Sequence, residues 1–149
     1  MWALFSNRAD FNDDISRWDV STVKDMIEML HGATSFNGDL SQWDVSNVSR
    51  MDYMLNGATS FNRDLSQWDV SYVTHMEYML NRATSFNGDL SQWDVSKVTN
   101  MEQMFDGATS FTHQLGRAWS TSTAIKYCMF RNCPGSIAGK TKDANGTPR

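Results

Sequence analysis

The chain has 149 residues, enough for one domain with a buried core. Its formal net charge of −4 and pI near 5.2 argue against nucleic acid as a partner, because nucleic-acid-binding proteins carry basic surfaces. No apolar run approaches the roughly 20 residues that cross a bilayer, so membrane insertion is not expected. The first residues lack the regions of a signal peptide and begin in mid-repeat, as expected of an excerpt or a trimmed chain.

A 25-residue repeat places all ten methionines in two columns. The columns are Met1, Met26, Met51, Met76 and Met101, and Met29, Met54, Met79, Met104 and Met129. A fixed period of this length is typical of repeat proteins whose units bury their apolar faces against one another. We therefore predict a single α/β solenoid over residues 1–133, with about five units and a degenerate last unit as its cap. Residues 134–149 lack the apolar columns and are predicted to be a disordered tail or linker.

One half of each unit is predicted to be a short helix. In residues 48–58, apolar side chains recur at spacings of three, three, one and three, which places them on one stripe of a helix. These residues are Val48, Met51, Met54, Leu55 and Ala58.

The other half is predicted to be a short strand. In residues 65–70, Trp68 and Val70 alternate with Gln67 and Asp69, so one face is apolar and the other polar. Helix axes need about 10 Å of separation and strands about half of that, so a stack of such units should curve. Equivalent tryptophans should stack in a dry interior.

The spacing L-x-x-W-x-V is that of a leucine-rich repeat with Trp in the second large position. The whole unit, V-x-x-M-x-x-M-[LF]-x-x-A-x-x-F-N-x-D-L-S-x-W-D-V-S, resembles the BspA-type leucine-rich repeat surface protein family. It is especially similar to the 25/26-residue subgroup found in bacterial surface proteins and in a mycoplasma family of unknown function. The resemblance covers about residues 1–133. It implies a curved leucine-rich-repeat-like coil and an extracellular or cell-surface location.

Two sets of residues form the candidate binding surface. The first is the polar face of the predicted strands, and the second contains positions that differ from unit to unit, where a scaffold can acquire specificity. Aromatic and basic side chains of the second set are common at interaction hot spots, although a drifting solvated surface is the simpler interpretation. The sets are Gln42, Asp44, Gln67, Asp69, Gln92 and Asp94, and Arg50, Tyr72 and His75.

Repeated carboxylates such as Asp44 and Asp69 could bind Ca²⁺, which takes oxygen ligands. They lack the dense grouping of a high-affinity site, and each is followed two residues later by Ser. That spacing favours a structural hydrogen bond at a turn. The asparagines of another ladder, Asn12, Asn37, Asn62 and Asn87, either form a ligand array or, as we favour, satisfy turn backbone.

No catalytic arrangement is found. His31, His75 and His113 occupy three different columns, so no metal site, cofactor or enzyme activity is predicted. Cys128 and Cys133 could close a small oxidised loop; the preferred interpretation is that Cys133 is buried and Cys128 faces outward.

These observations predict a non-enzymatic repeat scaffold that binds a protein or surface glycan, as in adhesion or display. The alternative is a structural array that binds carbohydrate, mineral or Ca²⁺ through repeated Asp, Gln, Ser and Thr ladders. Recognition by a scaffold should depend on variable residues such as Tyr72, whereas an array should lose binding gradually as ladders are removed. Edge-to-edge self-association is a further expectation, because the end of a stack leaves backbone groups unpaired.

Overall fold

The structure, a computed structural model, describes residues 1–149 and contains little regular secondary structure. Its elements are β1 (Gln114–Leu115), α1 (Ala118–Thr121) and β2 (Ser136–Ile137). β1 and β2 pair in parallel as a two-stranded sheet. Among the helices there is none with the length and apolar character needed to span a membrane.

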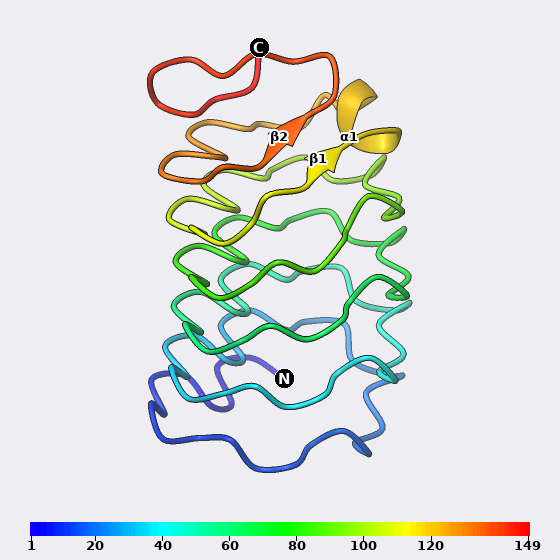
Figure 1. The fold of residues 1–149 in the computed structure, drawn as a ribbon. Helices are drawn as coiled ribbons and strands as arrows, with labels where there is room; N and C mark the ends of the chain where they lie inside the picture. Colours follow the sequence, from blue (N-terminus) through cyan, green and yellow to red (C-terminus); the bar gives the residue numbers. More distant parts are fainter.

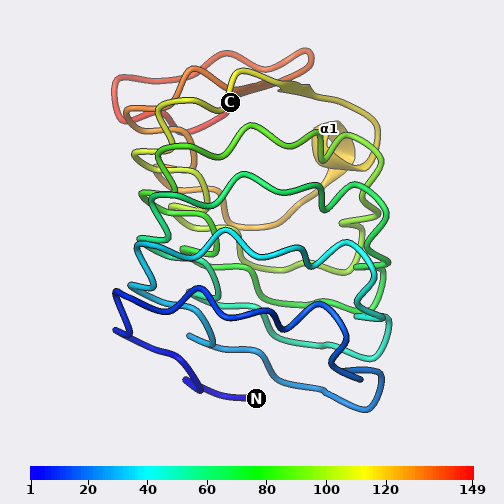
Figure 2. The ribbon, with the colours of Figure 1, turned by 60° about the horizontal axis from the view of Figure 1, so that its bottom comes forward.

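Before β1, the backbone winds in successive turns that lie one above another, with the chain termini at opposite ends (Figure 1). Positions 25 residues apart are neighbours, as shown by single parallel bridges that link Asp25, Arg50, His75, Asn100 and Ile125 in order. The tilted view shows the same stack without marked curvature (Figure 2). The repeat period thus sets the length of one turn.

The predicted fold class, an α/β solenoid or leucine-rich-repeat-like coil with one short strand and one short helix per repeat, is wrong. The predicted helix is a series of β-turns, in which N–H groups donate to the carbonyl three residues earlier. Met54 donates to Met51 at 3.2 Å and Ala58 donates to Leu55 at 3.1 Å. Tyr53, at φ 57°, and Gly57, at φ 71°, adopt a left-handed conformation that an α-helix excludes.

The spacing of the apolar residues explains this error. A four-residue turn places its first and fourth residues inside, and two consecutive turns repeat that pattern. The resulting spacing of three, one and three, seen at Met51, Met54, Leu55 and Ala58, is also that of a helical stripe. Periodicity therefore does not distinguish the two backbones.

The predicted strand at residues 65–70 is also absent, because a β-turn at 65–68 takes the place of its first half and a second β-turn follows at 70–73. Trp68 donates its N–H to the carbonyl of Leu65 at 3.1 Å, and Val73 donates to Val70 at 2.9 Å. Trp68 and Val70 are buried and Asp69 is exposed, so the predicted inside and outside positions are retained without an extended backbone.

The core is one continuous cluster built from rows of equivalent side chains. Trp68 and Trp93 are 4% and 2% exposed, and each indole Nε1 donates to the carbonyl of a leucine in the preceding turn, Leu40 and Leu65, at 2.9 Å. The two indoles are nearly parallel, with centroids 6.4 Å apart. Each indole thus buries a large apolar surface and leaves its one polar atom bonded.

The last unit departs from the repeat but stays in the stack. Trp119 lies 26 residues after Trp93, yet its indole stacks on Trp93 at 6.5 Å and donates to Leu90 at 3.0 Å. The additional residue is taken up around α1, where Arg117 has a φ of 49°.

The prediction of a disordered tail for residues 134–149 differs from the structure. β2 lies beside β1, Ile137 joins the core, and the segment that follows folds back over the last turn. Sequence periodicity has no signal here, because these contacts are made once and do not repeat.

Replacing Trp68 by Ala should lower the free energy of unfolding by about 3–5 kcal/mol, because a large buried side chain is lost. Trp18→Ala is the matched control: Trp18 occupies the same column but is 41% exposed, so a much smaller loss is expected. Urea unfolding at equilibrium measures both values. Equal losses at the two positions would contradict the internal tryptophan row.

Candidate binding surface

Differences between units gather on one part of each turn. In the three complete units, 26–50, 51–75 and 76–100, residues 47, 49, 50, 52, 53, 56 and 57 differ from their equivalents. Only one other position differs, occupied by Gly38, Arg63 and Gly88. We name the outward side chains of residues 22–32, 47–57, 72–82, 97–107 and 122–132 the variable face.

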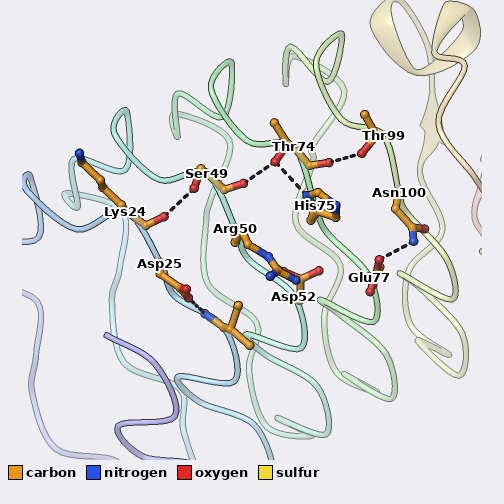
Figure 3. A network of polar contacts seen from close by, with 11 residues as sticks. Lys24, Asp25, Ser49, Arg50, Asp52, Thr74, His75, Glu77, Thr99 and Asn100 are labelled. Carbon is orange, nitrogen blue, oxygen red and sulfur yellow. Dashed lines mark hydrogen bonds and ion pairs between the residues drawn. The ribbon is translucent and has the colours of Figure 1, made fainter.

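An ion pair lies near the middle of the variable face (Figure 3). Arg50 Nε donates to Asp52 Oδ2 at 2.9 Å, and the side chain of Asp52 is only 3% exposed whereas that of Arg50 is 45% exposed. The hydrogen bond to Asp52 raises the pKa of Arg50, and the carboxylates of Asp25 and Glu77 add to this effect. The guanidinium group of Arg50 is therefore occupied by the buried carboxylate of Asp52.

A row of hydroxyl groups runs beside this ion pair (Figure 3). Ser49 Oγ donates to the carbonyl of Lys24 at 3.0 Å, and Thr74 Oγ1 donates to that of Ser49 at 3.1 Å. Thr74 Oγ1 also lies 2.9 Å from Nδ1 of His75. Because its only proton goes to Ser49, this hydroxyl accepts from His75, which places the neutral ring's proton on Nδ1 and leaves Nε2 as an acceptor.

Two tyrosines stack at the left-handed positions of adjacent turns. The rings of Tyr53 and Tyr78 are 4.6 Å apart and nearly parallel, with His31 edge-on to Tyr53 at 6.3 Å. Gln103 Nε2 donates to the hydroxyl of Tyr78 at 2.5 Å. Partial burial raises the pKa of both tyrosines, and the carboxylate of Glu102 adds to the effect at Tyr78. Both rings are therefore neutral at physiological pH.

A second ion pair closes the C-terminal end of the variable face. Arg131 binds the buried carboxylate of Asp106 through Nε at 3.1 Å and Nη2 at 2.5 Å, and Nη2 also donates to Gln103 Oε1 at 3.1 Å. The hydrogen bond to Asp106 raises the pKa of Arg131. Nearby in sequence, Ile125 and Tyr127 are exposed on the same face.

The predicted group of Arg50, Tyr72 and His75 is only partly assembled. Arg50 and His75 are bridged neighbours, but no hydrogen bond, ion pair or ring contact joins Tyr72 to either side chain. Tyr72 is 57% exposed and lies under the ammonium group of Lys97, 5.1 Å from the ring centroid. The sequence prediction omitted Lys97 as a site residue, although its row-by-row variation could have identified it.

The predicted polar set is exposed but engaged in local bonds. Asp44 Oδ1 accepts from the N–H and Oγ of Ser46 at 3.1 and 2.6 Å, and these bonds lower the pKa of the carboxyl. Asp69 and Asp94 accept from the N–H two residues later in the same way. The side-chain amides of Gln42, Gln67 and Gln92 donate to the preceding serine hydroxyls.

The asparagine ladder bonds one turn to the next. Asn37 Oδ1 accepts from the N–H of Asn62 at 3.0 Å, and Asn62 Oδ1 accepts from that of Asn87 at 2.9 Å. The structural interpretation of this ladder is thus confirmed.

No group of three or more His, Cys, Asp or Glu side chains is placed to hold a metal ion, and no pocket is present. Cys128 and Cys133 are both free and buried, so the oxidised loop is not formed. The expectation that Cys128 faces outward is wrong, because the C-terminal segment covers it and Thr147 Oγ1 accepts its N–H at 2.9 Å. Burial raises the pKa of the Cys133 thiol to about 11.

A profile of the family described as "Mycoplasma protein of unknown function, DUF285" matches residues 1–71 and 39–138. The chain belongs to this family. Comparisons with curated proteins and with solved structures found no match. In this DUF285 chain, all but one of the positions that differ between the complete units fall within residues 22–32 and their equivalents.

Hydrogen bonds from serine lower the pKa of Asp39, Asp44, Asp89 and Asp94 in the folded state. A lowered folded pKa adds stability above the ordinary pKa, and that stability is lost as pH falls through the folded value. Replacing all four by Asn retains the acceptor oxygens but removes the titration. The melting temperature should therefore fall less between about pH 4.5 and pH 2 than in the unsubstituted chain. Parallel curves would show that these carboxylates do not cause acid sensitivity.

Arg50→Met should lower the free energy of unfolding by about 1–2 kcal/mol, because it leaves the Asp52 carboxylate buried without a partner. The figure is below that for a fully buried pair because Arg50 is half exposed. Arg50→Met/Asp52→Asn should recover part of the loss, since the buried charge is removed. Chemical denaturation tests both; a double variant less stable than the single one would oppose this assignment.

Proposed function

We propose that the chain is a non-enzymatic repeat scaffold that binds a protein or surface glycan through its variable face. The observation that carries this proposal is the gathering on one face of nearly all the positions that differ between units. A scaffold of this kind keeps the residues that hold the fold and changes those that meet a partner.

The positions that stay the same have structural roles that explain their constancy. Tryptophan indoles, asparagine amides and the aspartate–serine pairs each make a bond that recurs in every complete unit. These bonds also weaken the alternative of a ligand-binding array, because many polar atoms of its ladders already have protein partners.

The exposed pair Tyr72 and Lys97 is the strongest contact candidate. The ring of Tyr72 offers a flat apolar surface and a hydroxyl, and Lys97 adds a charge above it. Tyrosine side chains with a neighbouring cation are frequent anchors in protein interfaces, and a flat ring also suits the apolar face of a sugar. Neither residue is needed to satisfy a buried group, so both can change without cost to the fold.

Family membership and the resemblance to BspA-type surface proteins support the location that we propose. A surface protein of that type is displayed or secreted and meets partners outside the cell. Extracellular or cell-surface display and a role in adhesion are accordingly parts of this proposal.

The test compares Tyr72→Ala/Lys97→Ala with Gln67→Ala/Gln92→Ala, a matched pair on the other candidate set. Labelled proteins are applied to a glycan array and to an array of purified extracellular proteins. For any target of the unsubstituted chain, the first variant should bind at least about tenfold more weakly and the control unchanged. Equal loss in both variants would favour the ladder array, and absence of any target would contradict the scaffold proposal.

A further inference from the structure

Four asparagines in the chain are followed directly by glycine, and they are Asn37, Asn56, Asn87 and Asn145. Such an asparagine can lose its side-chain amide when the backbone nitrogen of the next residue attacks the side-chain carbon. Glycine allows the attack because it has no side chain that keeps the two groups apart. The attacking nitrogen must first lose its proton, so the surroundings of each glycine N–H decide which asparagines can react in the folded chain.

The four glycine N–H groups fall into two classes. Gly57 donates to the carbonyl of Asn81 at 2.8 Å, and the N–H of Gly146 is also bonded, at 2.9 Å, within the C-terminal segment. By contrast, the N–H groups of Gly38 and Gly88 take part in none of the hydrogen bonds of the structure. Both of these glycines are partly exposed, so water can take their protons.

A side chain from the following turn binds the carbonyl of the same peptide unit. Arg63 Nε donates to the carbonyl oxygen of Asn37 at 2.8 Å. When the nitrogen of Gly38 loses its proton, peptide resonance shares the negative charge with this oxygen, so the guanidinium group stabilises the attacking anion. His113 has the equivalent position at the second site, where Nε2 lies 3.0 Å from the carbonyl oxygen of Asn87 and must be the donor.

The side-chain carbonyl that is attacked is also bound by the following turn. Asn37 Oδ1 accepts the N–H of Asn62 at 3.0 Å, and Asn87 Oδ1 accepts the N–H and Oγ1–H of Thr112 at 3.0 and 3.3 Å. Donors on this oxygen stabilise the negative charge that develops there when a nucleophile adds to the carbon. The asparagine ladder therefore polarises the amide groups that it holds in place.

We propose that Asn37 and Asn87 are modification sites, which deamidate in the folded chain with the help of groups from the following turn. The nitrogen of Gly38 or Gly88 forms a bond to Cγ of the preceding asparagine, and the bond from Cγ to Nδ2 breaks. The amide group leaves as ammonia, and water carries to it the proton that the peptide nitrogen lost. The product is a cyclic imide, which water opens to aspartate or isoaspartate.

Each event changes both charge and backbone at a site outside the variable face. Opening of the imide adds a carboxylate in either product. Isoaspartate at position 37 also inserts one more carbon into the main chain between Phe36 and Leu40, which are both buried in the core. The modification is irreversible and does not depend on the proposed binding role of the variable face.

Peptide mapping by tandem mass spectrometry tests the proposal on the folded chain incubated at neutral pH. Asn56 is the matched control inside the stack, because it also precedes glycine but the glycine N–H is bonded. Asn37 and Asn87 should deamidate at least about tenfold faster than Asn56, since removing a bonded proton also costs the hydrogen bond. In guanidinium chloride the three rates should become similar. Asn62, in the same ladder but followed by arginine, should remain intact in the folded chain.

Two substitutions test the role of the following turn, and each site serves as the control for the other. Arg63→Met should slow deamidation at Asn37 about tenfold and leave Asn87 unchanged, whereas His113→Ala should slow Asn87 alone by a similar factor. Neither replaced side chain belongs to the core, so the stack is retained. Folded-state rates at Asn37 and Asn87 no faster than at Asn56 would overturn the proposal. Unchanged rates in both variants would do the same.

Discussion

The structure depends on hydrogen bonds between turns at a fixed offset along the chain. Within a turn such as 51–58, the β-turns satisfy alternate N–H groups, and the others must bond elsewhere because buried backbone donors are rarely left unpaired. Met51 and Tyr53 find their acceptors in the following turn, on His75 and Glu77. Local turns and stacking are therefore inseparable, since neither pairs the backbone alone.

Side-chain ladders fix the register that the backbone bonds permit. A shift of one residue would take Trp68 away from the carbonyl of Leu40 and Asn62 away from its neighbours in the asparagine ladder. These bonds recur at the same offset, so each position that makes one must keep its residue type. Sequence constancy in most of the unit follows from this requirement, and freedom to vary is confined to positions outside it.

Repeat length, buried tryptophans and the structural role of the asparagine ladder could be predicted, because each follows from side-chain chemistry at a constant spacing. The backbone could not, since helix and consecutive turns bury Met51, Met54 and Leu55 alike. Whether such a segment forms a helix or consecutive β-turns depends on its hydrogen bonds to the next unit. The periodicity of the sequence carries no information about those bonds. Contacts made once were equally hidden, as at Gly146, where an added Cβ would lie 2.4 Å from backbone atoms of both Arg131 and Phe130.

For the candidate surface, variation between units identified Arg50, Tyr72 and His75 as outward positions, but it did not show what they contact. Arg50 is held by a carboxylate two residues away, whereas Tyr72 is free apart from Lys97. The difference between a structural arginine and an available tyrosine depends on the burial of Asp52, which lies in an otherwise outward column. Family membership agrees with the repeat pattern and leaves these roles to be decided from the geometry.

The left-handed positions connect the stability of the fold with its variable surface. Glu28, Tyr53, Tyr78 and Gln103 all have φ between 51° and 57°, a conformation that costs a non-glycine residue about 1–2 kcal/mol. The N–H group of each donates to the next turn, so the ladder offsets the strain and the stack holds the residue there. Hydrogen bonds to the neighbouring turn stabilise the left-handed conformation at this position. The residue there therefore need not favour that conformation by itself. The fold thereby tolerates tyrosine, glutamate or glutamine at one repeated site, which is the freedom that a binding face requires.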